Sequence, residues 1–208
     1  MKVTRYPQSC LLLEKDGHKI VIDPGVHFLR LHNIEELKGV EAALLTHRHA
    51  DHYDASITQT LQAQGAAIYA NADTAKLVGE GCTVVNDGDA LTIAGFAVEP
   101  RELPHCPMVN GKPGPQNTGY IIDGAFFHPG DGKELAGLHV NAMALPIAGP
   151  SISPEDAYNF AVQLGVKIAI PVHYDVFVAD PNVIARAFAD NGAPFELRVL
   201  ADGESTEI

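Results

Sequence analysis

Short apolar runs separated by tight turns dominate the first half of the chain. Such runs, when Gly, Pro, Asn or Asp bound them, are typical of β-strands. The strands that they predict cover residues 9–14, 18–22, 41–46, 66–70 and 96–99. The dipeptides Asp16-Gly17, Ala94-Gly95 and Asp123-Gly124 predict the turns of three β-hairpins. Asp54 is a suitable cap for a helix over residues 55–64.

The second half of the chain alternates strands with helices. Strands are expected over residues 142–147, 166–172 and 195–200. Ser153-Pro154-Glu155-Asp156 predicts a helix start, and that helix would end at Gly165. Asp180-Pro181 opens a second helix that would end near Gly192. Hairpins followed by strand–helix–strand units predict an α/β protein, a four-layer αββα sandwich of two mixed β-sheets flanked by helices.

Length and charge limit the classes of function. The 208 residues suffice for a sizeable core, and we expect residues 1–208 to form a single domain. The net charge of -12 disfavours a nucleic-acid partner, because phosphate backbones need a basic surface. No apolar stretch approaches membrane-spanning length, and the run Leu11-Leu12-Leu13 is too short for a signal peptide. We therefore expect a cytoplasmic protein without a membrane partner.

Potential metal ligands are concentrated in the hexapeptide His47-Arg48-His49-Ala50-Asp51-His52, directly after a predicted strand. Imidazole nitrogens and carboxylate oxygens are ligands that zinc accepts. At this spacing the four side chains do not easily bind one ion, so they predict two adjacent metal sites on the order of 4 Å apart. The alternative is a solvated polar loop. The one long loop, over residues 104–116, is rich in Pro and Gly and is a candidate functional segment.

The hexapeptide resembles the HxHxDH signature of the metallo-β-lactamase superfamily. The superfamily pattern continues with a downstream His, an Asp in a Gly-Asp step and a His after a late strand. In this chain His105, Asp131 and His173 occupy these places in that order. Residues 20–24, Ile-Val-Ile-Asp-Pro, also look like the first hairpin of the family.

Later segments are similar to one branch of the superfamily, which contains ascorbate-6-phosphate lactonase and small metal-dependent hydrolases. These segments are residues 117–122, 128–131, 144–147, 153–157 and 170–174. That branch often has a His near the start of the first hairpin, where this chain has Gln8. The departure leaves the lactonase chemistry itself open.

The resemblance implies the metallo-β-lactamase fold and a dinuclear centre. The implied ligands form two sets with one shared member: His47, His49 and His105 for one ion, Asp51, His52 and His173 for the second, and Asp131 bridging both. Asp51 and Asp131 would be the catalytic residues, with Asp51 also accepting a proton. The expected cofactor is a pair of Zn²⁺ ions, with Mn²⁺ as an alternative.

The implied reaction is hydrolysis of a small ester, lactone or amide by a hydroxide shared between the two metals. Hydrolysis of a small or lipid-like phosphodiester is the alternative. A di-iron redox protein usually has Glu at the position of His49, and a non-catalytic metal scaffold would need no open place for water, so both are less favoured. The expected partner is a small-molecule substrate, and a homo-oligomer is left open.

Residues next to the implied ligands have two interpretations each. Asp23 is expected to accept a hydrogen bond from a ligand histidine, and a turn-capping role is the alternative. His128, Tyr174 and Tyr53 could reach substrate, but packing is the favoured interpretation for His128 and Tyr174.

Overall fold

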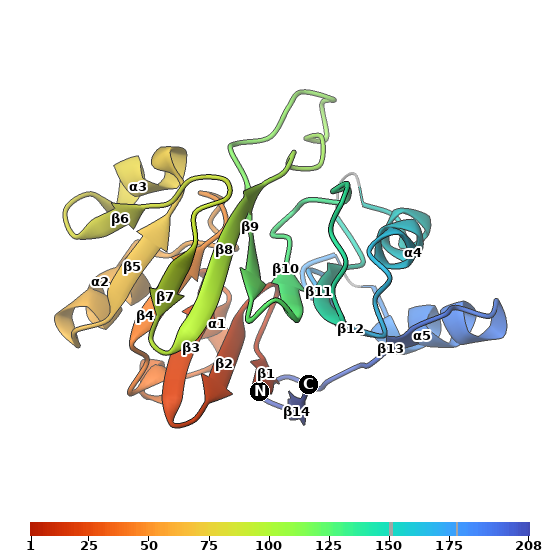
Figure 1. The fold of residues 1–208 in the computed structure, drawn as a ribbon, viewed down its shortest axis with the longest axis horizontal. Helices are drawn as coiled ribbons and strands as arrows, with labels where there is room; N and C mark the ends of the chain where they lie inside the picture. The colour runs from red at the N-terminus through yellow and green to blue at the C-terminus, as the bar shows by residue number, and fades with distance from the viewer. Residues whose placement is uncertain (150–151, 178) are drawn as a thin grey trace.

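In the residues that the computed structural model describes, 1–149, 152–177 and 179–208, two seven-stranded β-sheets lie face to face (Figure 1). The first sheet contains, in spatial order, β14 (Ser205–Glu207), β1 (Lys2–Arg5), β2 (Leu11–Lys15), β3 (His18–Ile22), β4 (Ala42–Leu45), β5 (Ala67–Ala70) and β6 (Cys82–Val84). The second contains β13 (Glu196–Leu197), β12 (Ile168–Val172), β11 (Ala142–Pro146), β10 (Phe126–His128), β9 (Thr118–Ile122), β8 (Phe96–Glu102) and β7 (Leu91–Ile93). Both sheets mix parallel and antiparallel pairs.

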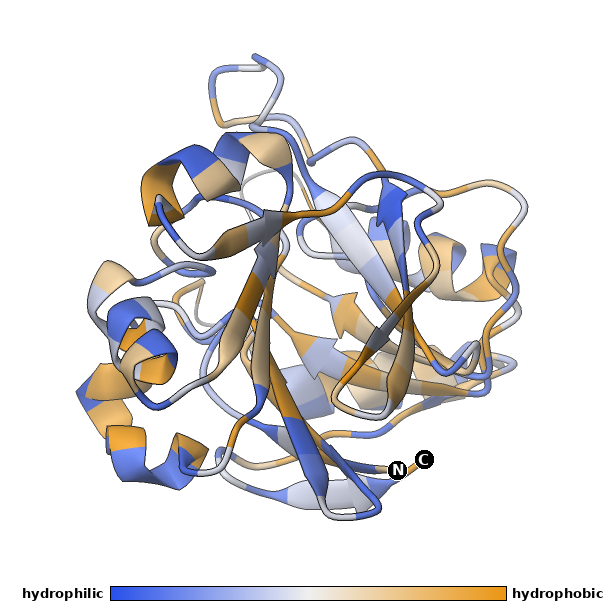
Figure 2. Ribbon diagram, turned by 60° about the vertical axis from the view of Figure 1, so that its left-hand side comes forward, coloured by the Kyte–Doolittle hydropathy of each residue, from blue (hydrophilic) through white to orange (hydrophobic). Residues whose placement is uncertain are grey.

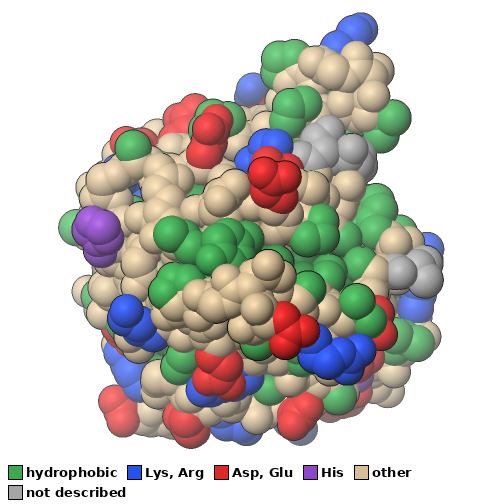
Figure 3. All heavy atoms as spheres, turned by 90° about the vertical axis from the view of Figure 1, so that its right-hand side faces the viewer, with side chains coloured by type: hydrophobic (Ala, Val, Ile, Leu, Met, Phe, Trp, Pro, Cys, Tyr) green, Lys and Arg blue, Asp and Glu red, His purple; other side chains and the backbone are tan. Residues whose placement is uncertain are grey.

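Helices cover the outer faces of both sheets. On the first sheet these are α1 (Phe28–Leu31), the 3₁₀ helix η1 (Ile34–Leu37), α2 (Ala55–Ala63) and α3 (Ala72–Val78). On the second sheet they are α4 (Pro154–Gln163) and α5 (Pro181–Asp190), and Figure 3 shows this side with apolar side chains gathered among charged ones. The expected four-layer αββα sandwich of two mixed sheets is therefore confirmed.

The main core lies between the two sheets, and alternation along the strands builds it. Leu11 and Leu13 of β2 belong to the same buried cluster as Phe96 and Val98 of β8, whereas Leu12 belongs to the cluster beneath the helices. This period of two is the expected geometry of a strand that is buried on both faces. Figure 2 shows the resulting concentration of hydrophobic positions along the strands.

The last predicted strand is wrong in length, since residues 195–200 contribute only the two-residue β13. After Leu197 the chain leaves the second sheet and reaches the first, where β14 pairs with β1. Arg198 links the two sheets at this point, because its guanidinium donates to Glu196 of β13 and to Thr206 of β14. Pairing between Val3 and Thr206 joins opposite ends of the sequence, so no local pattern predicts it.

Strands from both sheets deliver their carboxyl ends to one edge of the sandwich. In the second sheet β10, β11 and β12 are parallel, and β8 runs the same way because both β8 and β10 are antiparallel to β9. The strand β4 of the first sheet ends at the same edge, where Tyr120 of β9 donates to the carbonyl of Leu45 at 3.0 Å. None of the helices in the described ranges is long and apolar enough to cross a membrane.

Candidate metal centre

The loop after β4 carries the hexapeptide, and backbone contacts with the turn after β3 hold this loop in place. Val26 N donates to the carbonyl of Ala50 at 2.8 Å. Gly25 lies so close to the backbone of Asp51 that a Cβ at residue 25 would be 2.1 Å from the Asp51 carbonyl oxygen. His52 N in turn donates to the His49 carbonyl at 3.0 Å, which curls the loop. The backbone therefore presents the four potential ligands in one compact turn.

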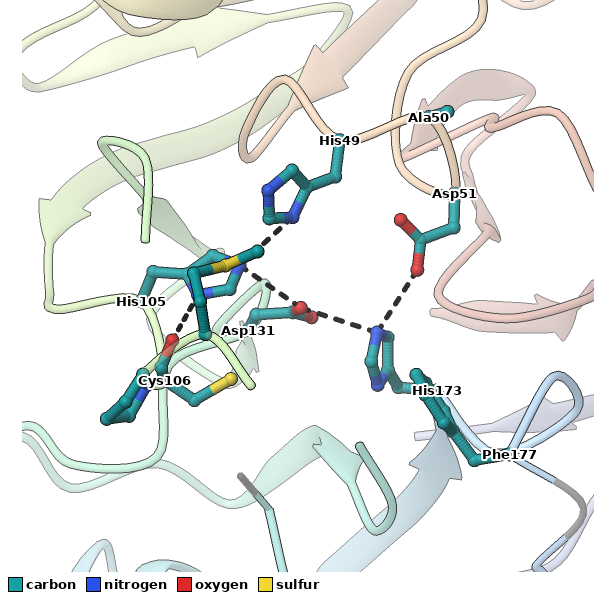
Figure 4. A pocket seen from close by; sticks show the side chains of 10 residues that line it. His49, Ala50, Asp51, His105, Cys106, Asp131, His173 and Phe177 are labelled. Atoms are coloured by element: carbon teal, nitrogen blue, oxygen red, sulfur yellow. Dashed lines mark hydrogen bonds and ion pairs between the residues drawn. The ribbon is translucent and has the colours of Figure 1, made fainter. Parts of the chain in front are cut away.

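The first group of potential ligands comes from two loops. His47 Nε2 lies 3.1 Å from His49 Nδ1. The same atom of His49 lies 3.2 Å from His105 Nε2 (Figure 4). His105 follows β8 and forms an isolated bridge with Gly132. With Asp131 these histidines form one group whose ligand atoms all lie within 4.8 Å of one another. The structure therefore brings together the three histidines that the resemblance assigns to one metal.

The second group lies beside the first. Its members are Asp51, His52 and His173, again with all ligand atoms within 4.8 Å. His173 Nε2 lies 3.3 Å from Asp51 Oδ2, and His52 Nε2 lies 3.8 Å from the same oxygen. His173 follows β12 with a left-handed backbone, φ 63°, which turns its side chain back to the centre. This is the set that the resemblance assigns to the second metal.

Asp131 lies between the two groups. Its Oδ2 is 3.3 Å from both His105 Nε2 and His173 Nε2, and its Oδ1 is 3.1 Å from His52 Nε2. The side chain is almost fully buried, with 5% exposed. A carboxylate in this position can contact two cations at once, as expected for the bridging residue.

The outer nitrogens of the ring systems are fixed by acceptors. A carbonyl or carboxylate oxygen can only accept, so Nδ1 donates and the neutral ring keeps its Nε2 lone pair for the centre. Three such bonds join His52 to Asp23 (2.7 Å), His173 to the Ala148 carbonyl (2.7 Å) and His105 to the Cys106 carbonyl (2.5 Å). The expected hydrogen bond between Asp23 and one of the predicted ligand histidines is thus confirmed.

Thr46 does the same for His47. Its hydroxyl donates its one hydrogen to Asp23 Oδ2 at 2.6 Å, so it accepts from His47 Nδ1 at 3.1 Å. Asp23 also accepts the Thr46 backbone N–H at 2.8 Å. One buried carboxylate therefore orients histidines from both groups.

The polar atoms that face the centre fit divalent metal ions. Among the described residues, His52 Nε2, His173 Nε2 and Asp131 Oδ1 are buried without a hydrogen-bond partner. Buried polar atoms are rarely left in this state, because the desolvation penalty is about 1–3 kcal/mol each. The three close nitrogens of the first group cannot all be satisfied by one proton, but they can all coordinate one cation. Nitrogen and oxygen ligands are those that zinc accepts.

The charges of the centre are coupled. Burial and the neighbouring imidazoles, His52 first, hold the pKa of His47 well below its usual value. Burial alone would raise the pKa of Asp131, but the charges of His173 and His52 hold it well below its usual value. Burial also opposes protonation of His105, yet the Asp131 carboxylate raises the pKa of His105 to about 10. A metal ion would displace protons from such nitrogens.

A cavity of about 330 Å³ opens over both groups. Metal-ligand candidates form its floor, namely His49, Asp51, His105, Asp131 and His173. The remaining lining residues, which we call the apolar wall, are Ala50, Cys106, Pro107, Met108 and Phe177. The loop over residues 104–116 supplies Cys106, Pro107 and Met108, and Phe177 stacks beside His173 at 5.1 Å between ring centroids (Figure 4).

Residues that sequence reasoning did not assign to the centre support it from behind. Asn117, which is buried, accepts the Asp131 N–H at 3.2 Å and donates to the Pro129 carbonyl at 2.9 Å. Gln8, also buried, donates to Asp51 Oδ2 at 3.2 Å. Neither lies in the hexapeptide, and a polar residue beside a strand is the only local signal.

The neighbours of the predicted ligands mostly pack, as favoured. His128 is buried and its Nε2 donates to the Ser9 carbonyl at 2.9 Å. The guanidinium of Arg5 stacks over the ring of Tyr174, with 4.5 Å between the Arg5 Cζ atom and the ring centroid. Neither lines the cavity. The hydroxyl of Tyr53 donates to the Leu77 carbonyl at 3.3 Å.

Comparisons with other proteins agree with this arrangement. A protein of Mycobacterium tuberculosis is 29% identical over 191 residues, covering 88% of this chain and 89% of its own. A UPF0173 metal-dependent hydrolase of Bacillus velezensis is 29% identical over 233 residues, with both chains covered completely. The structure of the metallo-beta-lactamase fold protein YhfI from Bacillus subtilis is 17% identical with a TM-score of 0.75, covering 99% of each chain, which shows the shared fold.

A family model settles the membership. The model for the beta-lactamase superfamily domain matches residues 2–173, which carry all seven potential ligands. The match extends over most of the chain and both sheets contribute to it. The protein therefore belongs to the beta-lactamase superfamily.

Proposed function

We propose that this metal-dependent hydrolase cleaves a small, uncharged acyl substrate, an ester, a lactone or an amide, in the cavity over the two ligand groups. The observation that carries the proposal is the difference in polarity between the floor of that cavity and its apolar wall. The floor holds the histidines and carboxylates, whereas the apolar wall supplies no charge. None of the described lining residues is Lys or Arg. A neutral acyl group matches such a wall better than an anion does.

Two bound metal ions, zinc or alternatively manganese, would supply an activated water at neutral pH and polarise the carbonyl oxygen of the substrate. Asp131 is placed to hold the two metal sites in a fixed relation, because its oxygens face both groups. Asp51 lines the cavity and its side chain is 25% exposed, so it can accept the proton of that water. His173 keeps Asp51 oriented through the 3.3 Å contact.

A phosphodiester is the competing substrate. Its anionic oxygens would find cations only in the metals, since the described lining offers no basic side chain. The cavity volume of about 330 Å³ suits a small molecule in either case. Nucleic acid stays unfavoured as a substrate because the chain carries a net charge of -12.

A substrate panel tests the proposal. The zinc-loaded protein would be assayed with lactones, with p-nitrophenyl esters of increasing acyl length, and with bis-p-nitrophenyl phosphate. We expect turnover of the carbonyl substrates, and we expect Phe177→Ala to lower kcat/KM for the longer acyl groups by about 10-fold. Val109→Ala is the control. Val109 lies in the loop over residues 104–116, next to Met108, but it is 83% exposed and does not line the cavity. Turnover of the phosphodiester alone would contradict the proposal.

A further inference from the structure

Gln8 lies behind the candidate metal centre and makes four hydrogen bonds, all to groups at or next to it. Its side-chain Nε2 donates to Asp51 Oδ2 at 3.2 Å, and its Oε1 accepts the Val176 N–H at 3.1 Å. Its backbone N–H donates to Asp175 Oδ2 at 2.7 Å, and its carbonyl accepts the His173 N–H at 2.9 Å. The residue is fully buried, so water does not compete for these bonds.

The orientation of the Gln8 amide follows from its partners. A backbone N–H can only donate, so the atom that faces Val176 must be the amide oxygen. The amide nitrogen is then necessarily the atom that faces Asp51. A primary amide donates without titrating, and it places no lone pair against the carboxylate.

Asp51 Oδ2 is shared between two neighbours from different segments. Gln8 Nε2 approaches it at 3.2 Å and His173 Nε2 at 3.3 Å. Among the described residues, Gln8 Nε2 is the one side-chain donor that is hydrogen-bonded to the Asp51 carboxylate. The Gln8 amide therefore constrains the orientation of this partly exposed carboxylate relative to the other members of the second ligand group.

The backbone around Gln8 is held in an unusual conformation on both sides of the contact. Gln8 has φ 60° and His173 has φ 63°, a region that costs a non-glycine residue roughly 1–3 kcal/mol. Arg5, which is 2% exposed, pairs with Asp175 and so fixes the acceptor of the Gln8 N–H. Such positions persist only where surrounding contacts over-determine them, and they cluster at functional sites.

We propose that Gln8 is a positioning residue for the second metal subsite: its amide, anchored by Val176, orients the Asp51 carboxylate toward His52 and His173. The inference rests on the proposed dinuclear function. It distinguishes the two metal subsites, because among the described residues the Gln8 side chain makes a hydrogen bond to Asp51 of the second ligand group and none to the first group.

Zinc titration of Gln8→Met tests the role. The side chain of Met has a similar length but no donor, and second-sphere changes of this kind typically lower metal affinity by about 10–100-fold. The protein would be freed of metal and titrated with zinc against a chromophoric chelator. We expect one of the two zinc ions, the one at the subsite of Asp51, His52 and His173, to bind about 10–100-fold more weakly, and the other to keep its wild-type affinity. Gln62→Met is the matched control, because its amide donates to the Glu80 carbonyl, away from the centre.

A second measurement needs no variant. In the wild-type protein with labelled glutamine, the side-chain amide protons of Gln8 should shift mainly with one of the two equivalents of zinc, the one that fills the subsite of Asp51, His52 and His173. The inference is overturned if these protons respond equally to both equivalents or do not respond. It is also overturned if Gln8→Met binds both ions as the wild type does or weakens both equally. A wild-type protein that binds fewer than two zinc ions would instead overturn the proposed function.

Discussion

Asp131 Oδ1 lies 3.1 Å from His52 Nε2, and neither atom has a hydrogen-bond partner among the described residues. The other oxygen of Asp131 lies 3.3 Å from His105 of the first ligand group and 3.3 Å from His173 of the second. One buried carboxylate thus joins the loop after β4 to the loop after β8. Its loss should affect both metal sites.

Asp131→Asn should reduce hydrolysis by at least about 100-fold while the protein stays folded, because the amide keeps the volume but cannot bridge two cations. The rate with the best substrate of the ester and lactone panel, together with circular dichroism, checks this. Asp87→Asn serves as the control, since Asp87 is exposed, pairs with Arg101 and does not line the cavity. Full activity of Asp131→Asn would rule out the bridging role.

Gly130→Ala should disrupt the turn that carries Asp131. A Cβ at residue 130 would lie 2.2 Å from Asn117 Oδ1, and the backbone has φ 59°. We expect a loss in the free energy of unfolding of about 3 kcal/mol or more, together with weakened zinc binding. Gly137 has φ 75°, and a Cβ placed there would have nothing within 4 Å, so Gly137→Ala should lose only about 1–2 kcal/mol. If urea unfolding showed equal losses in the free energy of unfolding for Gly130→Ala and Gly137→Ala, the close approach of residue 130 to Asn117 would have no effect on stability.

His32 should make stability depend on pH, although it lies outside the centre. Its ring bridges Glu36 at 3.0 Å and Asp202 at 2.8 Å. Burial opposes its protonation, but these carboxylates raise the pKa of His32 above the ordinary value of 6.5. The stabilisation is therefore fully present below pH 6.5 and is lost as the pH rises through the folded-state pKa.

Comparison of the wild type with Asp202→Asn isolates this effect, because the metal centre contributes equally to both proteins. The difference in the free energy of unfolding should be larger at about pH 5.5 than at about pH 9, by on the order of 1 kcal/mol or less. Denaturant unfolding at both values measures it. A difference that does not change with pH would contradict the assignment.

Local patterns predict part of the centre, because its candidate ligands follow strands. The hexapeptide from His47 to His52 predicts two metal sites from its spacing, and the resemblance to the superfamily pattern implies the remaining ligands. The structure brings all seven together, since the strands before His105, Asp131 and His173 run in the same direction. Their role as ligands stays a prediction.

Long-range contacts set the limit of prediction. Gln8 reaches Asp51 from the start of the first hairpin only because its backbone adopts φ 60°, and a sequence pattern does not reveal such a conformation. The short helix α3 escapes prediction because it spans only residues 72–78, although Asn71 caps it by accepting the Thr74 N–H at 2.9 Å. The early end of the last strand depends on the pairing of β14 with β1, which comes from the opposite end of the chain.

Elemental analysis of the purified protein tests the dinuclear centre most directly. The protein would be stripped with a chelator, reloaded with excess zinc, and freed of unbound metal before the metal content is measured. We predict close to two zinc ions per chain, and about one or fewer in Asp131→Ala, because the bridging carboxylate is lost. A well-folded wild-type protein that retains one zinc ion or none after reloading would contradict the account.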